Sequence, residues 1–159
     1  MLAESRQTNK SLYDTDYHLW VIETVNQLER REFNILDLEN LIEELSDLSR
    51  REKRKLESLL TRLFEHLLKL KYWQSERVQN QYHWQAEILN FRKQIQKELK
   101  SSPSLKPYLL EIFAECYQDS REIVSTRSQI LLEIFPSEAI ANLDQILDEN
   151  WLPAYEFYS

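Results

Sequence analysis

The hydrophobic positions of this chain recur every three or four residues over four stretches, which is the spacing of amphipathic helices. The first stretch covers about 15–31, with Asp14 as its N-cap and Tyr17, Val25 and Leu28 on its apolar side. The second runs from an N-cap at Asp37 to about residue 72. The third and fourth cover about 81–100 and 104–133, after a linker over 74–80 and a Ser-Pro break over 101–104.

The C-terminal part predicts shorter elements. Pro136 stops the fourth helix, and Ser137 and Asn142 can each cap a short helix, the second with Gln145 three residues on. The apolar residues 151–153 are expected to dock as an extended tail. No stretch alternates with period two, so we expect no sheet. The prediction is an all-α, up-and-down bundle of four main helices, with a long second helix and a short C-terminal helical tail, forming one domain over 13–159 after a disordered segment over 1–12.

The length of the second predicted helix bears on whether the chain associates with a second copy of itself. If it is continuous, it is about 54 Å long and extends well beyond the third helix. The overhang, residues 37–52, carries Leu38, Leu41 and Leu45 with other apolar residues, and the first helix can cover only one side of it. Two copies meeting across a two-fold axis would cover the rest. A break at Ser49, where Ser49 and Glu52 form a capping box, would instead give a compact monomer; we favour continuity.

Composition excludes several classes of site. The 159 residues include no glycine, so glycine-rich nucleotide loops and the G-x-S-x-G nucleophile elbow are absent. The one cysteine, Cys116, allows no internal disulfide and no multi-cysteine zinc site, and it reads as a core residue. There is neither an apolar signal segment nor a run of about 20 apolar residues. We therefore expect a cytoplasmic protein with no cofactor, no metal and no membrane contact.

The net charge of −7 makes nucleic acid an improbable partner. One basic cluster stands out, consisting of Arg50, Arg51, Lys53, Arg54 and Lys55. Its default interpretation is a solvated helix surface, with an acidic protein partner or nucleic acid as alternatives. The excess acids follow Ser128, and we expect them to lie against basic groups of the second helix, in the same chain or a neighbour.

Folding the later helices antiparallel about their connections sets His66, Trp84 and the pair Asp119 and Ser120 at one level. A buried imidazole beside these groups would need mutual hydrogen bonds. The set is either a satisfied polar layer of the core or a ligand or proton-transfer site. A metal site made by Glu43 and Glu44 with His66 is not expected, because one straight helix separates Glu43 from His66 by about 35 Å, and they would share a site only if the helix folded back near Ser49.

Several short segments carry a family resemblance. They are Tyr13-Asp14-x-Asp16-Tyr17-x-x-Trp20, Asp37-Leu38-x-Asn40-Leu41-x-Glu43-Glu44, His66-Leu67-Leu68-Lys69, Trp84-x-x-x-Ile88-x-x-x-Arg92, Ser102-Pro103-Ser104-Leu105, Phe135-Pro136 and Leu143-x-Gln145-Ile146-Leu147-Asp148. In this order, over about 13–153, they resemble the bacterial family called domain of unknown function twenty-nine. The resemblance implies an all-helical fold and no activity.

The leading functional hypothesis is a non-enzymatic interaction or regulatory protein that self-associates, as a homodimer or with another protein partner. A small-molecule- or metal-dependent enzyme built on the His66 layer is one alternative. An antitoxin-like or nucleic-acid-associated module that uses the basic cluster is another.

Overall fold

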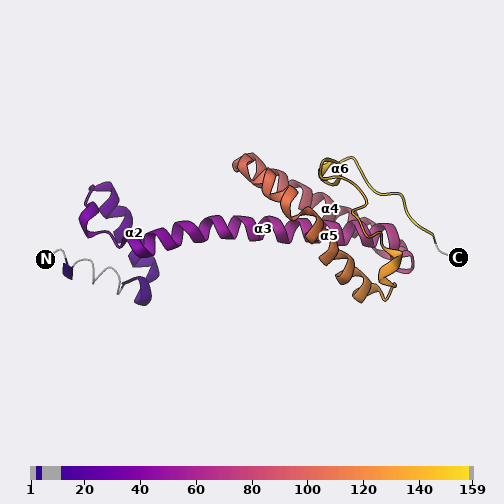
Figure 1. Cartoon of the computed structure of the whole chain (residues 1–159), viewed down its shortest axis with the longest axis horizontal. Helices are drawn as coiled ribbons and strands as arrows, with labels where there is room; N and C mark the ends of the chain where they lie inside the picture. The colour runs from indigo at the N-terminus through magenta and orange to yellow at the C-terminus, as the bar shows by residue number, and fades with distance from the viewer. Residues whose placement is uncertain (1–2, 5–11, 158–159) are drawn as a thin grey trace. The chain divides into compact units, whose positions relative to one another are not determined.

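The computed structural model describes residues 3–4 and 12–157, and in this part of the chain it contains helices and no strand. The elements after residue 16 are α2 (Tyr17–Glu29), η1 (Phe33–Ile35), α3 (Leu38–Tyr72), α4 (Gln74–Ser101), η2 (Pro103–Leu105), α5 (Lys106–Ser128), η3 (Leu132–Ile134) and α6 (Leu143–Leu147) (Figure 1). The all-α prediction is confirmed. The prediction of disorder over 1–12 falls mostly outside the described residues.

The contacts divide the chain into two compact units, Met1–Arg51 and Glu52–Ser159, which we call the N-terminal and C-terminal units. The boundary falls within α3. The single domain over 13–159 stays a prediction.

The N-terminal unit contains α2, η1 and the first turns of α3. The predicted cap at Asp14 is wrong by two residues, because it is Asp16 whose carboxylate accepts a hydrogen bond from the Leu19 amide at 3.0 Å. After α2, Arg31 has a φ of 58°, the left-handed conformation that commonly ends a helix. The sequence has no glycine to take this position.

The second predicted helix is continuous, so the alternative break at Ser49 is wrong. No proline or glycine occurs between residues 38 and 72, and the capping residues near Ser49 remain inside the helix. Arg50 spans this stretch, with its guanidinium 2.8 Å from a Glu43 oxygen and 2.6 Å from an Asp47 oxygen. The pair with Asp47, three residues away, has the spacing at which opposite charges favour the helical state.

The C-terminal unit packs α4 and α5 against the part of α3 after residue 52. Leu60, Leu63, Phe64 and Leu67 of α3 have essentially no exposed surface, and Ile95 of α4 is equally buried. The rest of this core includes Ile88, Phe91, Leu109, Ile112, Cys116, Tyr117 and Val124. Cys116 is therefore a core residue, as predicted.

The predicted linker over 74–80 is wrong, because α4 begins at Gln74 and only Trp73 separates it from α3. The guanidinium of Arg77 makes this tight turn possible. Its Nε donates to the Leu70 carbonyl at 2.8 Å and one terminal nitrogen donates to the Lys71 carbonyl at 2.7 Å. The last carbonyls of a helix otherwise lack partners, and a cation at that end also interacts favourably with the helix dipole.

The fourth predicted helix ends at Ser128 rather than near 133. Gln129 takes the left-handed conformation with a φ of 60°. The Ser128 hydroxyl donates to the Val124 carbonyl and accepts from the Ile130 amide at 3.2 Å. This hydroxyl therefore provides a partner for a carbonyl of the last turn and for the first amide after Gln129.

The C-terminal helix begins where Asn142 predicts, since its side chain accepts from the Gln145 amide at 2.9 Å, whereas Ser137 starts no helix. Phe135, Leu143 and Ile146 enter the core of the C-terminal unit. The non-helical tail after Trp151 then reaches α3, where the Glu156 amide donates to the Lys71 carbonyl at 2.8 Å.

Candidate interaction surface

In the N-terminal unit, aromatic side chains and carboxylates join α2 to α3. The hydroxyls of Tyr13 and Tyr17 donate to the two carboxylate oxygens of Glu44, at 2.8 and 2.7 Å. The hydrogen bond to this carboxylate raises the pKa of Tyr13 to about 12. The Tyr13 ring also meets the Trp20 ring edge-on, with the centroids 4.9 Å apart.

A second contact fixes the connection between the two helices. Trp20 is 2% exposed, and its indole nitrogen donates to Asp37, itself 3% exposed, at 3.3 Å. The same carboxylate oxygen accepts from the Asn40 side chain at 2.7 Å. Aromatic, carboxylate and amide groups therefore form the contact between α2 and α3.

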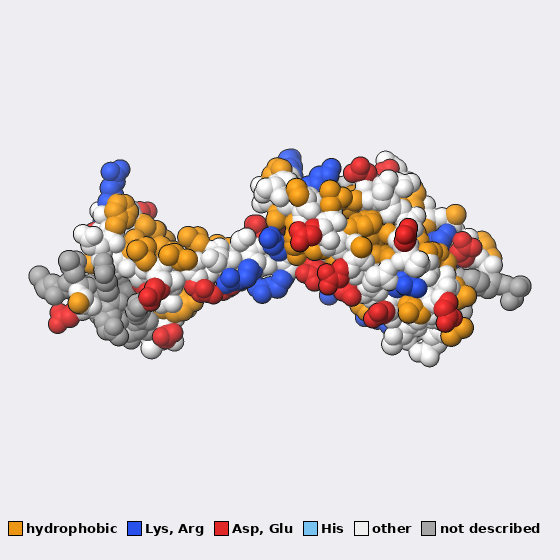
Figure 2. Space-filling model, in the orientation of Figure 1, with side chains coloured by type: hydrophobic (Ala, Val, Ile, Leu, Met, Phe, Trp, Pro, Cys, Tyr) orange, Lys and Arg blue, Asp and Glu red, His pale blue; other side chains and the backbone are white. Residues whose placement is uncertain are grey.

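Several large hydrophobic side chains of this unit remain in solvent. They range from 39% exposed at Leu28 to 61% at Ile42. We call the following set the apolar face: Leu19, Ile22, Val25 and Leu28 of α2, Phe33 of η1, and Leu38, Ile42, Leu45 and Leu48 of α3. Figure 2 shows hydrophobic side chains gathered on this unit. Leu41, also predicted for the surface, is only partly exposed.

The predicted basic cluster is largely occupied by contacts within the chain. Arg50 pairs with acids of its own helix, as described above. Lys55 pairs with Glu98 of α4, and the Lys53 ammonium lies 5.0 Å from the centroid of the Tyr108 ring. Arg51 and Arg54 are exposed. The cluster therefore does not form a continuous free basic surface.

The C-terminal acids pair with several helices. Glu156 lies 3.1 Å from Lys71 of α3, which agrees with the expectation that this segment contacts the second predicted helix. Glu149 instead pairs with Lys93 of α4 at 3.3 Å, and Asp144 lies 3.8 Å from Lys106 at the start of α5.

His66, Trp84 and Ser120 of the predicted polar layer each interact with other groups. The His66 ring contacts the Phe91 ring of α4, at 5.2 Å between centroids, and its Nδ1 lies 2.9 Å from the Arg62 carbonyl. The fully buried Ser120 hydroxyl lies 2.8 Å from the carbonyl of Thr61. In the described part of the chain, no hydrogen bond, ion pair or ring contact joins His66 to either Trp84 or Ser120.

The geometry of α3 explains this separation. Thr61 and His66 are five residues apart, which places them about 140° apart around a helix. Ser120 of α5 is therefore on a different side of α3 from the ring of His66. Trp84 stacks on Trp73, with the centroids 5.9 Å apart, and Asp119 is exposed. Burial lowers the pKa of His66, and the hydrogen bond with the Arg62 carbonyl and the charge of Glu87 oppose this shift only in part.

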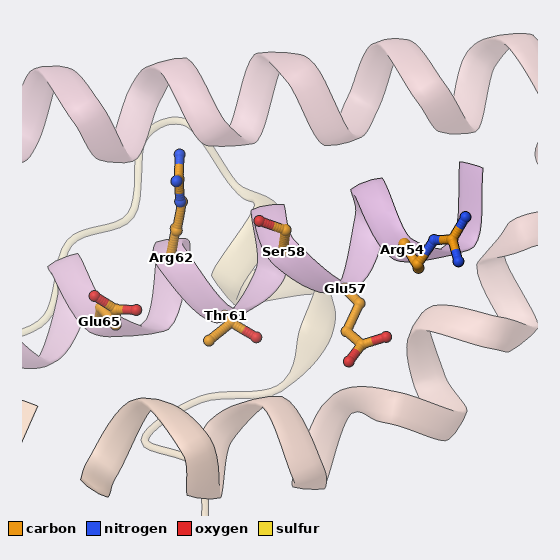
Figure 3. Close-up of a pocket in the computed structure, with 6 residues that line it drawn as sticks. All are labelled: Arg54, Glu57, Ser58, Thr61, Arg62 and Glu65. Atoms are coloured by element: carbon orange, nitrogen blue, oxygen red, sulfur yellow. The ribbon is translucent and has the colours of Figure 1, made fainter. Parts of the chain in front are cut away.

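The grooves of the C-terminal unit include one on α3 and one beside α5. The first is a groove of about 270 Å³ on α3 (Figure 3), lined by Arg54, Glu57, Ser58, Thr61, Arg62 and Glu65. In Figure 3 Arg62 points toward α4 and Glu57 toward α5. The second, of about 610 Å³, lies between α5 and residues 137–142 and is lined by Phe113, Ala114, Tyr117, Gln118, Ser137, Glu138, Ala139, Ala141 and Asn142. The described residues contain no cluster of His, Cys, Asp and Glu able to hold a metal ion.

Two buried arginines were missed as structural groups by the sequence analysis. Arg77 is 5% exposed, and besides the two carbonyls of α3 it donates to the Glu156 carbonyl at 2.9 Å. Arg92 is 1% exposed, and its Nε donates to the Ile146 carbonyl at 2.7 Å. Burial lowers the pKa of Arg92. A signal existed for Arg92, because it follows Trp84 and Ile88 at intervals of four on the apolar side of the helix.

No helix in the described ranges is both long enough and apolar enough to span a membrane. No match was found among curated proteins or solved structures. The family model described as "Domain of unknown function DUF29" matches residues 12–152. That match covers nearly the whole chain, including both helical units, and the segments that carried the resemblance lie almost entirely within it. The chain therefore belongs to the DUF29 family.

Proposed function

We propose that this chain is a non-enzymatic helical interaction protein that self-associates through the apolar face of its N-terminal unit. The observation that carries the proposal is the balance of buried and exposed hydrophobic side chains in that unit. Among its described residues, the buried hydrophobic side chains are Trp20 and Leu36 alone. The whole apolar face, together with Tyr17, is exposed.

A unit of about fifty residues has a large surface relative to its interior, so it can bury few hydrophobic side chains by itself. Fully burying a leucine or isoleucine side chain contributes about 1.5–3 kcal/mol. The side chains of the apolar face are roughly half exposed, so covering each would contribute about 1 kcal/mol. Large exposed apolar patches mark association sites in soluble proteins.

The polar candidates give less support to an enzyme. A general acid or base must lie within hydrogen-bond reach of its partner groups. His66 and Ser120 are on different sides of α3, and the hydroxyl of Ser120 is occupied by the Thr61 and Cys116 carbonyls. The occupied basic cluster likewise favours a protein partner over nucleic acid.

Light scattering after size-exclusion chromatography tests the proposal with a matched pair of variants. Leu45→Glu places a charge in the apolar face, where Leu45 is 59% exposed. Leu110→Glu places the same charge at a 58% exposed position of α5. At micromolar concentration we expect the wild type and Leu110→Glu to have twice the chain mass of 19.3 kDa, and Leu45→Glu to have the single-chain mass with unchanged helix content by circular dichroism. A wild-type mass of 19.3 kDa, or an equal loss in both variants, would contradict the proposal.

A further inference from the structure

We infer that the turn between α3 and α4 is a peptide-binding site, and that the chain's own residues 154–157 occupy it as a tethered ligand. We call these residues the tail peptide. The opposite side of the contact, which we call the tail site, consists of Lys71 at the end of α3 and Arg77, Gln81 and Gln85 of α4. The tail peptide is not helical (Figure 1) and lies beyond residue 152, where the match to the family model ends. Both sides of the contact belong to the C-terminal unit, so the inference is independent of the apolar face.

The tail site binds the main chain of the tail peptide at three points. The Lys71 ammonium donates to the Ala154 carbonyl at 3.0 Å, and the Arg77 guanidinium donates to the Glu156 carbonyl at 2.9 Å. The Glu156 amide donates in turn to the Lys71 carbonyl at 2.8 Å. Ala154 and Glu156 therefore face the tail site together, which is the alternation of an extended strand. Main-chain hydrogen bonds of this kind give affinity when a protein binds an extended peptide.

Side chains of the tail peptide give the contact its specific chemistry. The Glu156 carboxylate lies 3.1 Å from the Lys71 ammonium. The rings of Tyr155 and Phe157 lie on the guanidinium of Arg77, whose central carbon is 4.6 and 5.2 Å from their centroids. Arginine is the cation that most often makes such contacts with aromatic rings. The ligand of the tail site is therefore an extended segment in which a glutamate stands between two aromatic residues.

The stripe of α4 that carries Arg77 extends the recognition. Arg77, Gln81 and Gln85 follow one another at intervals of four, so they lie on the same side of the helix. The Gln85 amide donates to the Tyr155 hydroxyl at 3.1 Å, and this hydroxyl lies 3.5 Å from the side-chain oxygen of Gln81. The tail site therefore distinguishes a tyrosine at this position from a phenylalanine, which would leave both amides without this partner.

The tail peptide is exposed and joined to the core by a short tether. Phe157 is 73% exposed, and the side chain of Glu156 is 48% exposed. Exposed ion pairs and cation–π contacts each contribute little, so the contact can open and close. Ile146 of α6 is fully buried, and the short tether from it gives the tail peptide an effective concentration on the order of millimolar. A free peptide must therefore compete with the tail peptide for the tail site.

Peptide binding to the full chain with a weakened tail peptide tests the inference. Tyr155→Ala, Glu156→Ala and Phe157→Ala together remove the side-chain contacts of the tail peptide and keep every residue of the tail site. The probe is a synthetic peptide of residues 151–157 with a fluorescent label and uncharged ends, followed by fluorescence anisotropy. We expect saturable binding to this variant and binding at least about tenfold weaker to the wild type, because the wild-type tail peptide competes through its tether.

Changed probes test the chemistry of the site without altering the protein. A probe with Glu156→Lys places a cation against Lys71 and Arg77, so we expect it to bind the variant chain at least about tenfold more weakly. The matched control is a probe with Leu152→Ala, which lies outside the tail peptide and should bind like the unchanged probe.

Equal binding of the unchanged and Glu156→Lys probes would overturn the inference, as would equal binding of the unchanged probe to the variant and wild-type chains. Absence of binding to the folded variant at millimolar probe would overturn it as well. Circular dichroism shows whether the triple variant is folded. If it is not, the single substitution Glu156→Lys in the full chain replaces it, and the same results are expected.

Discussion

At two places in the C-terminal unit, an arginine side chain donates to backbone carbonyls near the end of a helix. Arg77 and Arg92 are almost completely buried, and each donates to backbone carbonyls rather than to a carboxylate. In this way Arg77 connects the end of α3 to the C-terminal tail, and Arg92 connects α4 to α6. The contacts of Arg77 use several donors of the planar guanidinium at once, which lysine does not provide.

Arg77→Ala should therefore lower the free energy of unfolding by about 3 kcal/mol or more, because hydrogen bonds to charged groups contribute about 1.5–3 kcal/mol each and the Leu70 and Glu156 carbonyls would lose the guanidinium donor. Urea unfolding followed by circular dichroism measures the change. The control is Arg54→Ala, since Arg54 is exposed, and it should stay within about 0.5 kcal/mol of the wild type. Equal effects of the two substitutions would show that the Arg77 contacts contribute no stability.

His66 gives the fold a specific pH dependence. Burial lowers its pKa below the ordinary 6.5; the charges of Lys69 and His83 lower it further, whereas the hydrogen bond with the Arg62 carbonyl and the charge of Glu87 raise it. Below pH 6.5 the unfolded chain binds the proton more readily than the folded one, so stability falls as the pH decreases from 6.5 toward the folded pKa. The urea midpoint of His66→Gln should thus fall less than that of the wild type between pH 7.5 and 5.5. His18→Gln, at an exposed position, is the control and should follow the wild type.

At the scale of elements, hydrophobic periodicity predicted the continuous α3, and side-chain chemistry predicted the Asn142 cap of α6. The start of α4 was not predictable from periodicity, because its first turns are polar and the contact that supports them comes from Arg77. The hydrogen bonds expected between His66 and Ser120 are not seen among the described residues, for a related reason. Counting residues along antiparallel helices gives their level, but it does not give the side of α3 on which His66 and Ser120 lie.

The shortest of these elements illustrates how much depends on packing. A five-residue helix such as α6 is not stable by itself, so its anchor in the core must hold it. Ile146 is fully buried, and Ile146→Ala should cost about 2–5 kcal/mol in urea unfolding and make the segment after residue 142 sensitive to protease. Leu152→Ala, at a 39% exposed position, should cost much less. A protease-resistant Ile146→Ala protein of wild-type stability would show that α6 is held by other contacts.

At the scale of the whole molecule, the two units differ in how completely they bury their hydrophobic residues. The C-terminal unit has a continuous core made by α3, α4, α5 and α6, whereas the described N-terminal unit buries Trp20 and Leu36 and exposes its aliphatic side chains. The sequence analysis anticipated the exposed leucines of α3 from the lengths of the helices. It did not anticipate that α2 would contact α3 through tyrosines and a tryptophan, which leaves the aliphatic residues of α2 exposed as well.

A second copy of the chain is expected to cover this apolar face. Sedimentation equilibrium of the wild-type chain, from about one to one hundred micromolar, measures this association. We expect a mass that rises with concentration to twice 19.3 kDa and goes no further, because a two-fold interface closes on itself. A mass of 19.3 kDa across the whole range would contradict it.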